Sequence, residues 1–435
     1  MEIETLKRSH LKRNIVIAVV VVVIISAITL TFTRAKYKTT ESIPLVNGTI
    51  NYTPYDLKMV AMYQEENGEY KSIDTVPTSG YTLNEEKSYC EVNDTKDESI
   101  SMEYKDGKVY IGVSKKGTKC YLYFDVQLCQ GEACNTILAN KEIKTRSLPF
   151  TTSTKVTDTT TEVIYQAEDD WGDTYYFAGN PTDNWVKFAG FYWRIIRING
   201  DGSIRMIYQG TSANTTGTGT QLQESAFNSS YNRSEYVGYM YTSGQQHGNT
   251  TDSPIKDIVD SWYSSNLASY ADKISKEAGF CGDRNMASGY SWSSTPSSTI
   301  YYAGYGRLVQ KSSSVNPTFK CSNSTDLYTV SGSSKGNKAL SNPVGLITAD
   351  EVTMAGLPWS GSTTSNYLYT GQYYWTMSPY SFGGSFASVF RVDSDGSLNY
   401  SWVNNSFGVR PVINLRSDIT ILSGDGTSSN PYVIL

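Results

Sequence analysis

Aromatic and amide side chains near the C-terminus are the residues whose types and spacing suit recognition chemistry. In the stretch Tyr373–Leu415, two strand-like runs, Ala387–Asp393 and Ser397–Val403, flank an Asp-Gly turn. Asp-Gly between alternating runs predicts a hairpin, because glycine tolerates the positive φ that such turns need. Aromatic rings give contact area and amides give directional hydrogen bonds, which suits both sugars and proteins. We expect the ligand contacts to come from Tyr380, Phe382, Tyr400, Trp402, Asn404 and Asn405.

Catalytic side chains are sparse. Histidine occurs only as His10 and His247, which argues against a zinc site, a histidine base or a nucleophile triad. Acidic residues are adjacent at 168–170 and at 350–351, and neighbours in sequence do not face one another across a cleft. We therefore expect no enzyme. A hydrolase acting on envelope or host glycans is the alternative, since its two carboxylates need only face each other in the fold.

Three similar turns, at 199–202, 393–396 and 423–426, contain Asp-Gly and raise the question of calcium. An EF-hand loop ends in a glutamate, and none follows these turns at that spacing. Hairpin chemistry accounts for all three turns. The sequence therefore predicts no metal and no cofactor.

Composition narrows the class of protein. A chain of 435 residues predicts two or three domains. Its 37 Lys plus Arg against 42 Asp plus Glu give a net charge of −5, so no basic surface for nucleic acid is expected. Tyrosine is abundant, at 34 residues. Tyrosines suit recognition surfaces, although half-exposed β-strands also favour them.

The N-terminal part predicts a membrane anchor. A short cytoplasmic tail, 1–13, precedes a transmembrane helix at 14–33, in which Ile15–Phe32 carries no charge. Eighteen helical residues span about 27 Å, close to the hydrocarbon thickness. A cleaved signal peptide is the alternative, but no A-x-A site precedes Arg34. We expect a single-pass protein of the cell membrane with its C-terminal domains outside the cell.

The cysteines support that location. All six follow the apolar stretch, four in one segment and two in the next, and even counts predict disulfides formed in an oxidising compartment. Free buried thiols are the alternative. We expect Cys90 to pair with Cys120 and Cys129 with Cys134, and a bridge in the next segment. The expected disulfide cysteines are Cys90, Cys120, Cys129, Cys134, Cys281 and Cys321.

Behind the anchor, the pattern predicts two domains and an α+β fold class. Residues 45–148 read as a β-sandwich-like spacer, 149–162 as a Thr-rich linker, and 163–435 as a large α+β domain. One helix should start at Ser253-Pro254 and continue, with a break, through Ala271–Ala278. A second should start at a capping box, Thr348 to Glu351.

Several segments resemble a family of uncharacterised, membrane-anchored surface proteins of Firmicutes-lineage bacteria. They include WVKFAGFYWRIIRINGDGSIRMIYQG, IKDIVDSWYSSNL, YYWTMSP and GVRPVINL. The resemblance covers residues 163–435 and, more weakly, the spacer. It implies a location at the cell surface rather than an activity.

A second resemblance concerns the fold of the large domain. The order Trp375-Thr376-x-Ser378, hairpin, Gly408-x-Arg410 is similar to C-type-lectin-like domains of formylglycine-generating enzymes and retroelement variable proteins. No cysteine follows Cys321, so the enzyme activity is not supported. The retroelement branch implies a variable display surface on the hairpin. We expect Trp375, Gly408 and Arg410 to hold that surface, Arg410 by binding loop carbonyls or a carboxylate, since a buried guanidinium must be paired.

These predictions together favour a binding or adhesion protein of the cell surface. Its partners would be the membrane, through the single-pass anchor, and a protein or glycan ligand. A glycan hydrolase and a structural envelope component are the alternatives. A deep pocket with two facing carboxylates would indicate the hydrolase, and a flat surface without a cleft would indicate the structural component.

Overall fold

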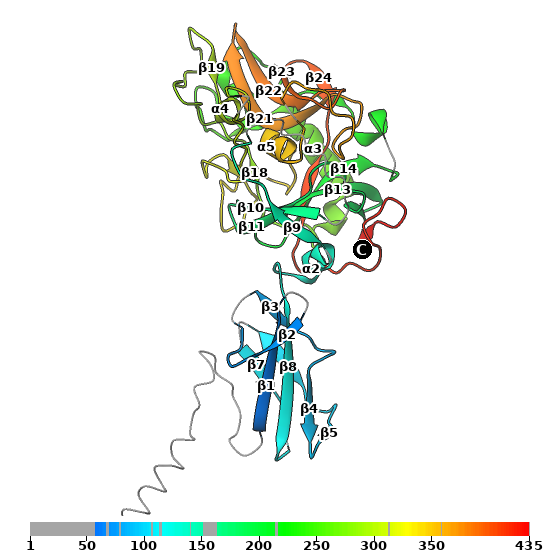
Figure 1. Ribbon diagram of the computed structural model, residues 1–435. Coiled ribbons are helices and arrows are strands. Elements are labelled where there is room, and N and C mark those ends of the chain that lie inside the picture. Colours follow the sequence, from blue (N-terminus) through cyan, green and yellow to red (C-terminus); the bar gives the residue numbers. More distant parts are fainter. Residues whose placement is uncertain are drawn as a thin grey trace, which may run out of the picture. The chain divides into compact units, whose positions relative to one another are not determined.

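A computed structural model describes residues 57–434, except 67–68, 78–79, 106–107, 113–114, 140, 151–162, 214–215, 312–313 and 358. The chain divides into two compact units, Met1–Gln127 and Leu128–Leu435 (Figure 1). The predicted transmembrane helix at 14–33 and nearly all of the predicted linker at 149–162 lie outside the described residues. Among the helices that are described, none has the length and apolar character needed to cross a membrane.

The first unit is built on one six-stranded sheet, ordered β2-β1-β8-β4-β5 with β3 added on β8, and a separate β6–β7 hairpin. Its small core joins Met62, Leu122 and Phe124 of the sheet to Val109 of the hairpin. Cys90 and Cys120 are directly paired across β4 and β8 and form a disulfide. The strands are β1 (Leu57–Glu66), β2 (Glu69–Ile73), β3 (Tyr81–Leu83), β4 (Tyr89–Val92), β5 (Thr95–Lys96), β6 (Met102–Lys105), β7 (Lys108–Ile111) and β8 (Thr118–Val126).

The boundary between the units lies at Gln127/Leu128 and not at residue 148 as expected. Helix α2 (Glu132–Leu138) buries Ile137 and Leu138 in the core of the second unit. Strand β9 (Glu142–Thr145) then pairs in parallel with β10 (Val163–Asp169). The short connection therefore packs with the larger domain, and its disulfide, Cys129–Cys134, belongs to that domain as well.

The second unit contains an eight-stranded sheet ordered β25-β14-β13-β11-β10-β9, with β12 and β26 joined to β13 through β12. The predicted hairpin at 199–202 is present, because β13 and β14 pair antiparallel and Gly202 adopts φ 79°. The remaining strands are β11 (Gly172–Tyr176), β12 (Trp185–Phe188), β13 (Phe191–Ile198), β14 (Ile204–Gly210), β25 (Val412–Leu415) and β26 (Tyr432–Ile434).

A six-stranded sheet, drawn in orange in Figure 1 along β21–β23, carries the C-terminal hairpin. Its order is β15-β24-β21-β22-β23, with β19 on β21. The hairpin forms where predicted, with Val392 opposite Leu398 and Gly396 at φ 80°. The strands are β15 (Glu224–Ala226), β19 (Ile300–Tyr301), β21 (Tyr374–Gly383), β22 (Phe386–Val392), β23 (Leu398–Trp402) and β24 (Ser406–Gly408).

The α+β prediction is wrong, because the structure is mostly β, with 37% strand and 12% helix. The predicted helical continuation through Ala271–Ala278 is absent, since Ile274 bridges Leu415 and the Ser275 amide donates to Asn414 O at 2.7 Å. Tertiary pairing replaces the helix there. The other short elements are α3 (Pro254–Asn266), α4 (Ala303–Leu308), α5 (Ala349–Met354), β16 (Met240–Tyr241), β17 (Thr251–Asp252), β18 (Phe280–Cys281), β20 (Leu327–Tyr328), and 3-10 helices at Gly217–Thr220, Ser234–Val237 and Ala268–Tyr270.

Both predicted helix starts are confirmed. Helix α3 begins at Pro254 after Ser253. At α5 the capping box is complete: Thr348 Oγ1 accepts the Glu351 amide at 3.1 Å, and Glu351 Oε2 accepts the Thr348 amide at 2.9 Å. Glu351 also binds Arg197 at 3.2 Å and Arg205 at 2.5 Å. One carboxylate therefore caps a helix and contacts two buried arginines of the eight-stranded sheet, and Asp169 supplies the second negative charge at 2.5 Å from Arg197.

Acid is expected to destabilise the second unit. Burial alone would raise the pKa of Glu351, but Arg205 and Arg197 outweigh burial and hold the pKa below its ordinary value. Because the unfolded carboxyl binds protons more readily, this stabilisation is complete above its ordinary pKa, about 4.3, and is lost as pH falls through the lower folded pKa. Denaturant midpoints should fall below pH 5, and Glu351→Gln should flatten that dependence. A midpoint independent of pH from 6 to 3 would contradict this account.

Candidate ligand-binding face

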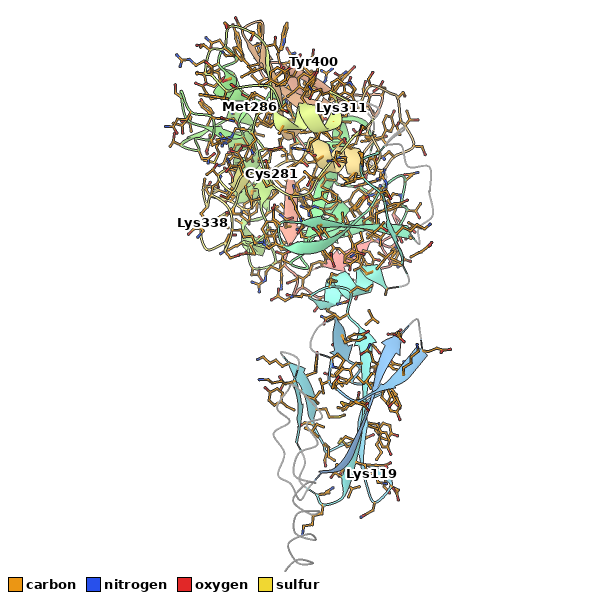
Figure 2. All side chains as sticks on the ribbon, turned by 60° about the vertical axis from the view of Figure 1, so that its left-hand side comes forward. Lys119, Cys281, Met286, Lys311, Lys338 and Tyr400 are labelled. Carbon is orange, nitrogen blue, oxygen red and sulfur yellow. A yellow bond between two sulfur atoms is a disulfide. The ribbon has the colours of Figure 1, made fainter. Side chains whose placement is uncertain are left out.

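Two large aromatic side chains project from the edge strand of the six-stranded sheet. Tyr400 and Trp402, two residues apart on β23, are 40% and 47% exposed. They lie opposite Phe390 and Ser388 of β22, and directly paired residues share one face of a sheet. Figure 2 shows Tyr400 on this sheet, and we name the partly exposed rings around it the aromatic face. The aromatic face comprises Tyr231, Trp359, Phe386, Tyr400 and Trp402.

Two stacks of parallel rings fix the aromatic face. In the first, Phe386 lies between Tyr231 (centroids 5.0 Å apart, planes at 12°) and Trp402 (4.3 Å, 16°). In the second, Tyr380 stacks on Tyr400 at 4.0 Å and 9° and on Trp359 at 5.7 Å and 10°. Stacked rings have few accessible rotamers. Binding to them therefore loses little conformational entropy.

Backbone pairing brings the loop residues of the face to the hairpin. The Ala387 amide donates to Tyr231 O at 2.8 Å, and the Val403 amide donates to Ala387 O at 3.0 Å. Trp359 forms a parallel bridge with Leu398 of β23. Segments separated by more than a hundred residues thus contribute to one surface.

The predicted ligand contacts divide into exposed and buried residues. Tyr400, Trp402, Asn404 and Asn405 are exposed. Asn405 is partly engaged, since its Nδ2 donates to Ser401 Oγ at 2.8 Å and its amide donates to Trp402 O at 3.1 Å. Asn404 is an exposed residue in the turn that follows β23, and it carries a side-chain amide.

Tyr380 and Phe382 are corrections to the predicted contacts. Tyr380 is 6% exposed and Phe382 is 4% exposed. Their strand β21 is central and is covered on both faces, because α4, α5 and the 3-10 helix at 234–237 pack against it. Tyr380 supports the face by stacking on Tyr400, and Phe382 belongs to the core.

The residues expected to hold the face are fully buried. Trp375 is 0% exposed, and its Nε1 donates to Ser225 O at 2.8 Å. At Gly408 a Cβ would come within 1.8 Å of Gln221 Oε1, so any larger side chain must displace Gln221. These contacts tie β21 and β24 to the segment around β15.

Arg410 is also 0% exposed. Backbone carbonyl oxygens and one side-chain amide oxygen, and no carboxylate, accept its hydrogen bonds. Its guanidinium donates to Tyr208 O at 3.1 Å and 3.2 Å, to Gln209 Oε1 at 2.7 Å and to Leu368 O at 3.3 Å. Burial lowers its pKa from the ordinary value. Of the two kinds of partner that the sequence left open, carbonyl oxygens are observed and a carboxylate is not: Leu368 O lies in a loop, whereas Tyr208 O belongs to strand β14.

Sequence reasoning missed Tyr231, Trp359 and Phe386. Phe386 had a usable signal, because Phe386, Ser388 and Phe390 alternate along one strand. Tyr231 and Trp359 lie in loops without periodicity, and only tertiary pairing places them.

Acidic residues from the two adjacent groups in the sequence line a small cavity and do not belong to the aromatic face. Asp350 and Glu351 line a cavity together with Asp170, Asp283 and Arg307. Its volume is about 20 Å³, enough for about one water molecule. Arg307 forms ion pairs with two of these acidic side chains, at 2.5 Å from Asp283 and 2.8 Å from Asp350. This cluster therefore has no room for a sugar ring.

The three Asp-Gly turns share one hydrogen-bond pattern. Asp201, Asp395 and Asp425 each accept, on Oδ1, the amide two residues ahead, at 2.9 Å, 3.0 Å and 3.0 Å. Such turns use the aspartate to stabilise the loop itself. Across the described part of the chain, no three His, Cys, Asp or Glu side chains are grouped so as to hold a metal.

All six cysteines are paired as predicted. The third bridge joins Cys281 and Cys321 in the second unit. Disulfides of this kind persist in oxidising, extracellular environments.

Comparisons with known proteins find no matching family model, no matching curated protein and no matching solved structure. The resemblances to Firmicutes surface proteins and to C-type-lectin-like domains therefore stay predictions.

Proposed function

We propose that the protein is an extracellular binding or adhesion protein, displayed at the outer side of a cell membrane, that engages a protein or glycan ligand through the aromatic face. The observation that supports this proposal is the exposure of Tyr400 and Trp402, each of which belongs to an ordered group of stacked rings. If these rings were buried, packing in the core would account for them without a binding role. Large rings that are both exposed and held rigid are typical of binding hot spots.

The exposed apolar side chains are also unevenly placed. Eight large hydrophobic residues of the described chain are exposed, and Tyr231, Tyr400 and Trp402 of the aromatic face are three of them. Clustered exposed apolar side chains mark interaction sites more often than scattered ones. The neighbouring Asn404 adds a hydrogen-bonding group at the margin.

The disulfides support the proposed location. Both units contain a disulfide, and none of the six cysteines is free. Membrane-impermeant biotinylation of intact cells tests the location. We expect labelling of lysines in both units without lysis, and labelling only after lysis would contradict an extracellular position.

The binding role predicts a loss of affinity when the exposed rings are removed. Trp402→Ala and Tyr400→Ala should each weaken retention of the full-length chain on glycan and extracellular-protein arrays by at least about tenfold, as expected for hot-spot aromatics. Tyr110→Ala is the matched control, because Tyr110 is a 42% exposed tyrosine of the first unit. Unchanged retention for both face variants, with the fold intact by circular dichroism, would refute the proposal.

A further inference from the structure

A second surface with recognition chemistry lies along α3, in a groove that shares no residue with the aromatic face. The groove has a volume of about 580 Å³. Small-ligand sites range over about 300–1,000 Å³. Its size is therefore suited to a small molecule or to a short segment of a polymer.

A fixed indole ring forms part of the groove wall. Trp262 is half-buried, and three aromatic rings pack around it. Their centroids lie 5.4 Å (Phe191), 6.0 Å (Trp193) and 5.5 Å (Tyr208) from that of Trp262. These neighbours hold the indole in place, and its partly accessible side chain lines the groove.

Polar side chains accompany the indole on the same side of the helix. Asp257, Ser261 and Ser265 follow one another at intervals of four residues and line the groove. That interval places side chains in one row along a helix. Gln223, which is exposed and lies outside the helix, contributes an amide to the lining of the groove.

The end of the groove adds an oriented amide. Asn266 Nδ2 donates to Trp262 O at 2.8 Å, which fixes the side chain and leaves its Oδ1 as the acceptor. Carboxylate, hydroxyl and amide groups therefore surround one aromatic plane.

The charge of the groove excludes an anionic ligand. No lysine or arginine is among its lining residues, and Asp257 contributes a negative charge. The nearest helix lysine, Lys256, is buried and engaged with Asp252 at 2.9 Å and Asp260 at 2.5 Å. A cationic ligand would find only one carboxylate. A neutral ligand with hydroxyl groups and one apolar face fits the whole set.

We propose that this groove binds a short neutral saccharide. One sugar ring packs its C–H face on Trp262, and its hydroxyls hydrogen-bond to Asp257, Gln223 and Asn266. The pairing of a flat apolar surface with several polar groups matches the two sides of a pyranose ring. This site is separate from the aromatic face, so the two can be tested independently.

Titration of the full-length chain with neutral and acidic oligosaccharides tests the proposal. Isothermal titration calorimetry should show binding of a neutral oligosaccharide from the set. Asp257→Ala and Gln223→Ala should each weaken that binding by at least about tenfold. Both residues are exposed, so the fold should persist. Trp262→Phe keeps an aromatic ring in the packing and should weaken binding less than removal of Asp257.

Ser264→Ala is the matched control, because Ser264 is exposed on α3 outside the groove. It should bind as the unmodified chain does, and so should Trp402→Ala. Three results would overturn the proposal: no neutral oligosaccharide binds, acidic ones bind better, or the groove variants bind normally. Loss of saccharide binding in Trp402→Ala alone would assign the sugar to the aromatic face and also overturn it.

Discussion

Replacing Asp326 by alanine is expected to lower the free energy of unfolding by about 3–5 kcal/mol, the cost of leaving a buried charge unpaired. Arg284 and Asp326 have fully buried side chains. Arg284 donates to Asp326 Oδ1 through Nε at 2.9 Å and Nη2 at 2.6 Å, and its amide donates to Oδ2 at 2.6 Å. Without the carboxylate, the guanidinium stays in the core without its counter-ion.

The lowered pKa of Asp326 also indicates that the fold stabilises its charged form. Burial alone would raise it, but hydrogen bonds and charge from His247 and Arg284 outweigh burial and hold the pKa below its ordinary value. The carboxylate is therefore stabilised in its charged form by the fold. Loss of this pair removes stability that is present at neutral pH and above.

Denaturant unfolding measures this effect, and an exposed pair of the same chemistry is the control. Arg416 and Asp418 form a surface ion pair with side chains 49% and 62% exposed. Asp418→Ala should cost at most about 1 kcal/mol. Equal losses in the two variants would show that burial of the Arg284–Asp326 pair has no energetic consequence.

Removing the Cys281–Cys321 disulfide is expected to cost about 4 kcal/mol. The bridge closes a sequence separation of 40 residues, so its loss frees a long loop in the unfolded chain. The Cys129–Cys134 bridge closes a separation of only 5. Its removal should cost about 2 kcal/mol by the same loop-entropy relation.

Paired Cys→Ser variants compared by denaturant unfolding test this order. The chain offers its own control, since both bridges lie in the second unit and undergo the same chemical change. A larger loss for the short loop would mean that local contacts, rather than loop entropy, dominate the contribution of these bridges.

Local chemistry made parts of the fold predictable from sequence. The turn at 393–396 forms because glycine adopts a positive φ there, and the capping box forms because Thr348 and Glu351 lie three residues apart. The turn and the capping box depend on residues close in sequence. The even number of cysteines predicted disulfides, although Cys90–Cys120 and Cys281–Cys321 join residues 30 and 40 positions apart.

Features that depend on tertiary packing were not predictable. Ile274 and Ser275 lie in a helix-like pattern, yet pairing with β25 and the chain around it leaves that segment non-helical. The aromatic residues of β21 read as surface, because sequence alternation does not reveal whether a strand is covered on both faces. Tyr231 and Trp359 reach the aromatic face only through long-range backbone contacts.

Oxidative footprinting of Tyr400 and Trp402 is the most direct test of the central claim. Hydroxyl-radical modification of the full-length chain is measured by mass spectrometry with and without the tightest-binding member of the glycan and protein arrays. Both residues are exposed in the free chain and should be modified readily. The account predicts that the bound ligand protects Tyr400 and Trp402 while Tyr110 stays reactive. Unchanged reactivity of both residues at saturating ligand, with protection elsewhere, would contradict it.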